Sequence, residues 1–289
     1  MSRSSLTRFA WLSIAAALVT IVLKTWAWHV TGSVGLLSDA LESIVNLLGG
    51  VMALAMLTIA QRPPDEDHAF GHGKAEYFSS GVEGSLILLA AVSIGVASFE
   101  RLMNPQSLEQ PGLGLAVSLC ASLVNLGVAI LLLRVGRERR SITLEANAQH
   151  LLTDVWTSVG VLVGVGLVVI TGWNSLDPIV GLLVAANIIW TGVGIVRRSI
   201  AGLMDAAISP EDLASVKTIL ESYRTDGIEF HDLWTRQAGA RKFISFHVSV
   251  PGEWTVHRGH ELLEKIETGI GISLPDTAVF THIEPLDNK

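Results

Sequence analysis

The sequence predicts an α-helical membrane protein, in which six transmembrane helices are followed by a small cytoplasmic α+β domain. Two observations lead to this fold class. The 289 residues are 49% hydrophobic and only 16% charged, with a mean hydropathy of +0.48, whereas an ordinary soluble domain carries about 25% charged residues. Ordinary polar composition returns only near the C-terminus, so we expect a membrane domain over residues 1–204 and a cytoplasmic domain over residues 205–289.

The composition also excludes several classes of protein. A net charge of −7 argues against a nucleic-acid partner, because phosphates repel an acidic surface. Cys120 is the one cysteine, so no disulfide can form within the chain. A chain this apolar is neither disordered nor a purely soluble enzyme.

Six apolar stretches reach the roughly 20 residues that a helix needs to cross the hydrocarbon of a bilayer. They lie near residues 9–31, 33–60, 77–100, 112–134, 143–171 and 177–197. The first is too long for a signal peptide and five more follow it, so we assign it as a helix. Ten Lys and Arg residues of the loops and N-terminus fall on one side of the membrane and only Arg101 on the other. This asymmetry places both termini in the cytoplasm. We expect the spans to lie in the cell's inner (plasma) membrane.

Ionisable side chains inside the second and fifth spans are the strongest functional signal, because a charge at mid-bilayer costs about 2.5 to 3.5 kcal/mol on insertion scales. Each span carries polar residues at positions i, i+3 and i+7, which lie on one stripe of a helix. The two sets are Asp39, Glu42 and Asn46, and Asn147, His150 and Asp154. An internal repeat would produce this shared spacing, and repeats in transporters place the substrate site near the membrane midplane.

Four of these residues can converge on one divalent cation, because carboxylates offset its charge and first-row metals accept mixed nitrogen and oxygen ligands. The proposed ligands are Glu42, Asn46, His150 and Asp154. Asp39 either supports a ligand or lies at the outer mouth of the site. One alternative is a hydrogen-bonded network that only packs the helices. Another is a hydrolase site, although the sequence has neither a G-x-S-x-G motif nor a second-metal pair.

The loop between the second and third spans reads P-P-D-E-D-H-A-F-G-H-G-K-A-E. Asp65, His68 and His72 lie three and four residues apart, which is a spacing typical of metal ligands. Gly71 and Gly73 allow the loop to fold closely around an ion. The alternative is a solvated loop in which the histidines are incidental.

The C-terminal residues predict the order αββαβ, with helices at 210–224 and 257–270 and strands at 228–237, 241–250 and 276–284. Alternation along the last two strands sends their apolar residues to the core and His247, His282 and Glu284 to the opposite face. With His231 and His260, these residues could gather at one or two metals, or they could be a scattered surface set. Because one sheet face is left bare, we expect a partner to cover it in a homodimer.

Taken together, these features resemble the cation diffusion facilitator family. The likeness rests on the six spans, the paired ligands, the loop string from His68 to Glu76, and a tail bearing the segments H-D-L-W-T-R and F-H-V. It implies a dimeric exporter of divalent transition metals driven by proton uptake, with a metallochaperone-like or ferredoxin-like tail. The resemblance places a transport site at residues 42, 46, 150 and 154, a loop site at 65, 68 and 72, and a binuclear site at 231, 247, 260, 282 and 284. It also implies a charge interlock between Lys74 and Asp205.

The second span departs from the family pattern, because zinc exporters usually carry His or Asp, then Asp, at the positions of Glu42 and Asn46. A neutral amide lowers the charge of the site. We therefore rank Zn²⁺ and Fe²⁺ first as cargo, with Co²⁺, Cd²⁺ and Mn²⁺ behind. Metal binding needs neutral imidazole and ionised carboxylate, so loading would displace protons and favour antiport by alternating access. The functional alternative is a membrane-anchored metal sensor whose tail carries the function.

Overall fold

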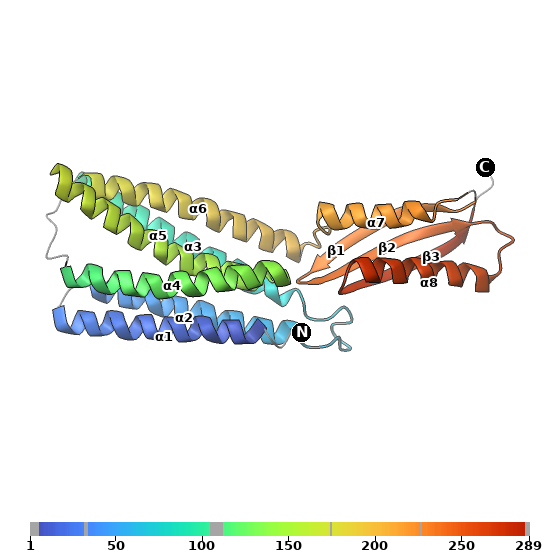
Figure 1. The fold of residues 1–289 in the computed structure, drawn as a ribbon, viewed down its shortest axis with the longest axis horizontal. Coiled ribbons are helices and arrows are strands. Elements are labelled where there is room, and N and C mark those ends of the chain that lie inside the picture. Colours follow the sequence, from blue (N-terminus) through green and yellow to red (C-terminus); the bar gives the residue numbers. More distant parts are fainter. Residues whose placement is uncertain (1–5, 32–33, 105–111, 174, 226, 287–289) are drawn as a thin grey trace. The chain divides into compact units, whose positions relative to one another are not determined.

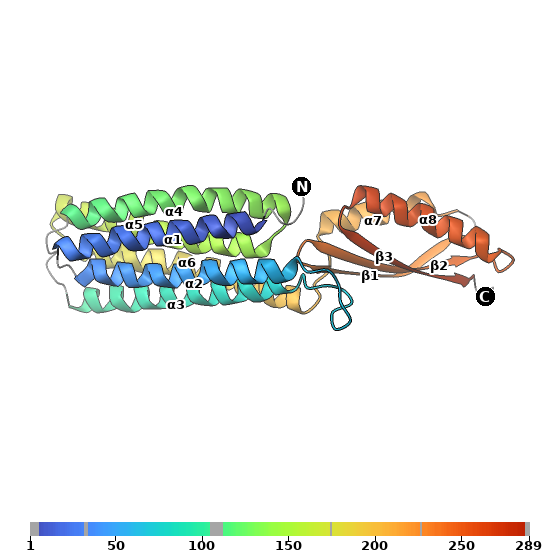
Figure 2. The same cartoon turned by 90° about the horizontal axis from the view of Figure 1, so that it is seen from below.

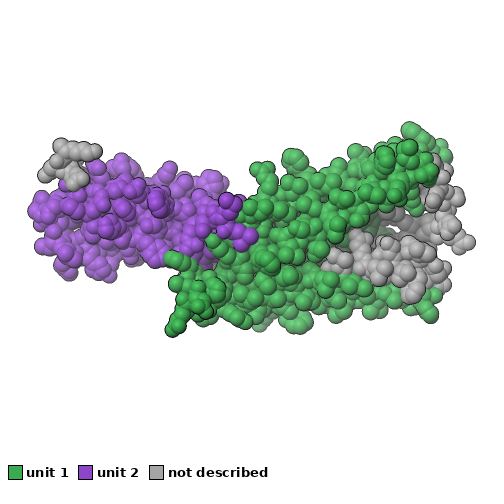
Figure 3. Space-filling model, turned by 180° about the vertical axis from the view of Figure 1, so that it is seen from behind, with its two compact units in different colours: residues 1–200 green, residues 201–289 purple. Residues whose placement is uncertain are grey.

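The computed structural model describes residues 6–31, 34–104, 112–173, 175–225 and 227–286. Within the helices it does not describe the side chains at 27–28, 30–42, 45–46, 112–115, 118, 161–162, 164–166, 168–169 and 177. Close contacts divide the chain into two compact units, residues 1–200 and residues 201–289 (Figure 3).

The first unit is a bundle of six long helices that run side by side (Figures 1 and 2). They are α1 (Leu6–Thr31), α2 (Val34–Ala60), α3 (Ala75–Met103), α4 (Gly112–Arg139), α5 (Ile142–Thr171) and α6 (Leu176–Leu203). By length and composition, four described segments could cross a membrane: Leu6–Trp26, Ala75–Met103, Leu119–Arg139 and Pro178–Leu203. The described part of α2 adds a shorter apolar stretch, Leu47–Ala60. The prediction of a helical membrane domain is confirmed.

The cytoplasmic starts expected for α3 and α5 are tied to each other by hydrogen bonds. Glu76, in the first turn of α3, accepts a hydrogen bond on its side chain from Ser141 Oγ. Thr143 Oγ1, at the start of α5, donates to the main-chain oxygen of Glu76 at 3.1 Å. These bonds fix the first turns of α3 and α5 at the same level of the bundle.

A close approach joins α3 to α6. A Cβ atom at Gly84 would lie 2.9 Å from Val196 Cγ2 and 3.0 Å from Ile195 Cγ2, so only glycine permits this helix spacing without a shift. Below this contact, Ser199 of α6 donates to the main-chain oxygen of Tyr77. The face of α3 that carries Gly84 therefore packs on α6.

The second unit has the expected αββαβ order. Its elements are α7 (Pro210–Ser222), β1 (Glu229–Ala238), β2 (Arg241–Val250), α8 (Val256–Ser273) and β3 (Thr277–Pro285). β1 and β2 pair antiparallel, whereas β2 and β3 pair parallel and are connected through α8. Ser209 caps the start of α7 by accepting from the main-chain N–H of Asp212.

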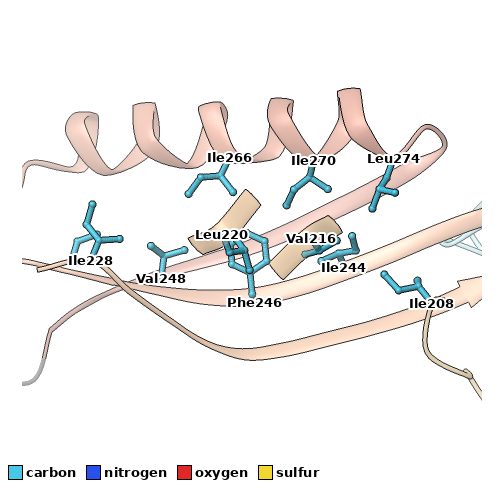
Figure 4. Packing of buried hydrophobic residues seen from close by; sticks show 11 residues of the cluster. Ile208, Val216, Leu220, Ile228, Ile244, Phe246, Val248, Ile266, Ile270 and Leu274 are labelled. Carbon is cyan, nitrogen blue, oxygen red and sulfur yellow. The ribbon is translucent and has the colours of Figure 1, made fainter. Parts of the chain in front are cut away.

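Alternation along β2 builds the core of this unit, as the sequence predicts. Ile244, Phe246 and Val248 are fully buried and pack with Ile266 and Ile270 of α8 (Figure 4). Val216 and Leu220 of α7 belong to the same core cluster, so both helices cover one face of the sheet. The other face is left for the polar side chains that alternate with the core residues.

Candidate metal sites

His150 and Asp154 lie one turn apart on α5 and point into the helical unit. Only 7% of His150 and 8% of Asp154 are exposed. Asn125 of α4, itself 2% exposed, donates from Nδ2 to Asp154 Oδ2 at 3.1 Å. The amide thus orients one carboxylate oxygen and leaves the other to a different partner.

Asn147, one turn before His150, continues this buried polar row toward α1. Its Oδ1 atom accepts a hydrogen bond from Ser13 Oγ at 3.0 Å. The side chains of Asn147 and Ser13 are 3% and 1% exposed. The predicted stripe on α5 therefore lies inside the bundle, in contact with α1 and α4, rather than toward lipid.

The predicted partners on α2 cannot be placed at the level of side chains. The main chain at Asp39, Glu42 and Asn46 belongs to the helix α2, but their side chains lie outside the described residues. Convergence of the two pairs on one ion therefore stays a prediction.

The loop after α2 brings Asp65, His68 and His72 together. One ligand atom from each lies within 4.8 Å of the others. Asp65 Oδ1 lies 3.1 Å from His68 Nδ1, and Asp65 Oδ2 lies 3.3 Å from His72 Nε2. Gly71 has a φ of 83°, and its N–H donates to the main-chain oxygen of His68, which turns the loop back on itself. One carboxylate and two imidazoles in this arrangement suit a divalent metal.

The surroundings of Asp65 favour its ionised form. Desolvation raises its pKa, but hydrogen bonds from the backbone and side chain of His68 and the charges of His72 and His68 outweigh it, so that the pKa of Asp65 is lowered. A carboxylate that stays ionised is ready to ligate a metal at neutral pH.

The bare face of the tail sheet carries a second cluster. His231, His247 and His282 occupy matching positions on β1, β2 and β3, so they form a row across the sheet. The rings of His231 and His247 are 5.2 Å apart, and those of His247 and His282 are 4.9 Å apart. Glu284 Oε1 lies 2.7 Å from His231 Nε2, and its Oε2 lies 3.7 Å from His247 Nδ1. The structure thus brings four of the five predicted tail residues together.

Charge coupling in this cluster moves two pKa values in opposite directions. The hydrogen bond to Glu284 raises the pKa of His231, with Asp232 adding to the effect and desolvation opposing it. The same hydrogen bond lowers the pKa of Glu284. In the absence of metal, the carboxylate of Glu284 therefore favours protonation of His231.

His260 is not brought into this cluster within one chain. It lies on α8, which covers the opposite, core-facing side of the sheet, and its Nε2 lies 3.6 Å from Glu264 Oε1 on the same helix. Its assignment as a ligand stays a prediction.

Lys74 and Asp205, the predicted interlock, belong to different compact units. Lys74 is the residue before α3. Asp205 has a φ of 58° just beyond α6, and its Oδ1 accepts from Arg236 Nη1 at 3.0 Å. An interlock between Lys74 and Asp205 stays a prediction.

Sequence reasoning missed three polar residues near these sites. Asp232 reaches two of the three histidines in the tail cluster, with Oδ2 3.3 Å from His231 Nδ1 and 3.9 Å from His247 Nδ1. Strand alternation does not predict this, because a φ of 50° at Asp232 and a register shift in β1 interrupt the alternation of side chains between the two sheet faces. Asn125 and Glu83 are polar residues inside apolar spans, and their position in hydrocarbon was the available signal.

Comparison with protein-family models identifies two matching regions. Residues 10–204 match the cation efflux transmembrane domain, and residues 208–286 match the cation efflux protein cytoplasmic domain. The chain belongs to the cation efflux family. The predicted resemblance to cation diffusion facilitators is confirmed, and membership makes this chain a membrane cation transporter.

Individual cation efflux relatives match along nearly the whole chain. The uncharacterized transporter sll1263 of Synechocystis sp. is 51% identical over 280 residues, covering 97% of this chain and 90% of that protein. The cation-efflux pump FieF of Klebsiella pneumoniae is 28% identical over 279 residues, covering 96% of this chain and 92% of the pump. A solved structure, the metal-bound C-terminal domain of the CzcD transporter from Thermotoga maritima, has 27% identity and a TM-score of 0.25, covering 28% of this chain and 98% of that one.

Proposed function

We propose that this cation efflux protein exports divalent transition-metal ions from the cytoplasm in exchange for protons. The observation that carries the proposal is the buried pair of His150 and Asp154 inside a bundle of apolar helices, with Asp154 oriented by Asn125. A nitrogen and a carboxylate oxygen one turn apart make half of a mixed-ligand metal site. Glu42 and Asn46 supply the other half, and Asp39 lies near them on the same helix.

Proton exchange follows from the chemistry of these ligands. A metal and a proton compete for the same imidazole nitrogen of His150 and the same carboxylate oxygen of Asp154. An ion that enters from the cytoplasm therefore releases protons, and protons that return from the other side help to expel the ion. Exposure of the site alternates as the helices rock, so that metal and protons move in opposite directions.

The loop and tail clusters bind the same ions on the cytoplasmic side. Asp65, His68 and His72 form the loop site. The tail residues form a binuclear site that tightens a homodimer and biases transport; its ligands are His231, His247, His260, His282 and Glu284. Such regulation requires two conformations that differ in metal affinity. An interlock of Lys74 with Asp205 links the two units.

The cargo is Zn²⁺ or Fe²⁺ first, then Co²⁺, Cd²⁺ and Mn²⁺. One imidazole, two carboxylates and an amide give a site with more oxygen than nitrogen, which suits the harder ions, while intrinsic affinity favours zinc. The protein lies in the inner membrane, and its termini are in the cytoplasm because basic residues concentrate in the loops on one side.

Flux in reconstituted vesicles loaded with a metal-sensitive dye tests the proposal. Replacement of both His150 and Asp154 by alanine should abolish uptake of Zn²⁺ and Fe²⁺. The matched control replaces His257 and Glu261, an exposed pair with the same spacing on α8, whose Nε2 and Oε1 atoms lie 3.4 Å apart. This control should retain flux.

Two results would count against the exporter. Undiminished flux in the double variant would remove the transport site, and absence of any flux from the intact chain would favour a membrane-anchored sensor. Antiport is tested separately, because collapse of the proton gradient should end uphill transport and counter-movement of protons should be measurable.

A further inference from the structure

Glu83 of α3 is a buried carboxylate that the proposed transport site does not use. None of its surface is exposed. Within the part of the chain that the structure describes, neither Oε1 nor Oε2 has a hydrogen-bond partner. Glu76 on the same helix is also buried, but it accepts a hydrogen bond from Ser141. Among the described residues, Glu83 therefore has no hydrogen bond like the one that accounts for the burial of Glu76.

The depth of Glu83 in the bundle matches that of His150. The first turns of α3 and α5 are tied where Thr143 donates to the main-chain oxygen of Glu76 at 3.1 Å. Glu83 lies seven residues beyond Glu76, and His150 lies seven residues beyond Thr143. At 1.5 Å per residue, both side chains are about 10 Å farther along their helices. Because α3 and α5 are neighbours, Glu83 lies at the level of the proposed transport site.

The carboxylate of Glu83 faces the helix that carries the other proposed ligands. A Cβ atom at Gly49 of α2 would lie 3.9 Å from Glu83 Oε1. Gly49 is one turn beyond Asn46, so this contact adjoins the polar stripe of α2. Because Gly49 has no side chain, nothing from that residue occupies the space in front of the carboxylate.

Ser79 supplies a further oxygen atom in the same environment. It precedes Glu83 by one turn on α3, which places both side chains on one face of that helix. Ser79 is fully buried, and its Oγ has no hydrogen-bond partner among the described residues. Among the described residues, two carboxylate oxygens and one hydroxyl oxygen on this face of α3 are thus buried without hydrogen-bond partners.

A carboxylate buried in this way needs either a proton or a cation to offset its charge. Burial of an ionised carboxylate without a counter-charge is strongly unfavourable, and oxygen atoms are the ligands that the harder divalent metals prefer. We propose that Glu83 and Ser79 form a second binding position for the transported divalent metal, between α2 and α3 and level with His150. This inference rests on the proposed function, because it names an additional ligand group for the same cargo.

The test compares Glu83→Gln with Glu76→Gln in the full chain reconstituted in vesicles. Both replacements remove a buried carboxylate from α3 and keep its shape. Glu83→Gln should raise the half-saturating Zn²⁺ or Fe²⁺ concentration for flux about tenfold, the lower end of the losses seen when metal-supporting groups are removed. Glu76→Gln should leave that concentration within about twofold of the parent, because Glu76 bonds to protein groups.

Thermal unfolding of the metal-free protein separates a ligand from a structural residue. Glu83→Gln should keep or raise the unfolding midpoint, because it removes a buried carboxylate that has no hydrogen-bond partner among the described residues. Glu76→Gln should lower the midpoint. Two milder variants guard against failure to fold. Glu83→Asp keeps the carboxylate, so its half-saturating metal concentration should fall between those of Glu83→Gln and the parent. Ser79→Ala should raise the half-saturating concentration a few-fold without loss of stability.

Three outcomes would overturn the proposal. Half-saturation of Glu83→Gln within twofold of the parent would remove Glu83 as a ligand. A drop in its unfolding midpoint like that of Glu76→Gln would make the residue structural. A change only in the number of protons exchanged would make Glu83 a proton site. Flux that survives alanine at His150 and Asp154 would instead refute the transport function, so the two failures are distinguishable.

Discussion

The hydrogen bond from Asn125 to Asp154 allows a quantitative test of the transport site. Asn125→Leu keeps a side chain of similar size but removes the Nδ2 donor that lies 3.1 Å from Asp154 Oδ2. A hydrogen bond to a charged group contributes about 1.5 to 3 kcal/mol, and each factor of ten in affinity corresponds to about 1.4 kcal/mol. Loss of this bond should therefore weaken metal binding about ten- to a hundredfold, in line with other groups that orient metal ligands.

The assay is the metal dependence of initial flux in dye-loaded vesicles, with half-saturation read from a concentration series. Asn125→Leu should shift half-saturation upward by that factor while the thermal unfolding midpoint changes little. The matched control is Asn187→Leu, the same replacement at an exposed position of α6, which should not shift half-saturation. An unchanged value for Asn125→Leu would refute the view that a fixed carboxylate at Asp154 binds the cargo.

Three further predictions concern the tail and the second span. Lys242 Nζ lies 3.0 Å from Asp212 Oδ2, and both side chains are under 10% exposed. Asp212→Asn should therefore lower the free energy of unfolding, measured in urea titrations, by about 3 to 5 kcal/mol. Replacement of both residues by apolar ones should recover most of this loss. In metal-free protein, His231 should titrate in NMR above the ordinary pKa of about 6.5, because Glu284 raises its pKa. The interaction of protonated His231 with Glu284 should stabilise the fold fully below pH 6.5, and this stabilisation should be lost as the pH rises through the folded-state pKa. Both effects should disappear in Glu284→Gln. Asn46→Asp should shift metal preference toward Zn²⁺ or Cd²⁺ over Fe²⁺ in competition binding, and unaltered preference would mean that the amide does not tune the site.

Hydropathy predicted the membrane helices well but ended some of them early. The fourth and sixth spans were expected to end at 134 and 197, whereas α4 continues to Arg139 and α6 to Leu203. Hydropathy predicts only the part of a helix that lies in the hydrocarbon of the bilayer. The helix can continue beyond it into water when polar side chains stabilise the extra turns. On α4, Arg134 and Glu138 do so through an i, i+4 pair at 3.0 Å.

Strand periodicity was sufficient to predict the tail cluster, because residues of one parity share a sheet face. Its limit is seen at Asp232. Asp232 reaches the histidines through a left-handed backbone conformation that alternation does not anticipate. The sequence alone does not show which sheet face α8 covers, and the packed core places it on the face opposite the histidine row. The role of His260 as a ligand stays a prediction.

Helical spacing predicts which residues share a face of one helix, but not what that face contacts. The pair of His150 and Asp154 repeats at helical intervals and was visible in the sequence. Asn125 and Glu83 also follow other polar residues at helical spacing, Ser122 in one case and Ser79 in the other, but what each contacts depends on which helix packs against it. That information comes from tertiary contacts and not from the periodicity of one segment.

The irregularity at Asp232 also shapes the outer edge of the sheet. β1 pairs with β2 on one side only, and the opposite edge of such a strand offers main-chain groups to any extended segment that meets it. Between His231 and Trp234 the register shifts, and a bulge of this kind bends the edge away from a straight template. The same irregularity that brings Asp232 to the histidines therefore also opposes pairing of this edge with a strand of another copy.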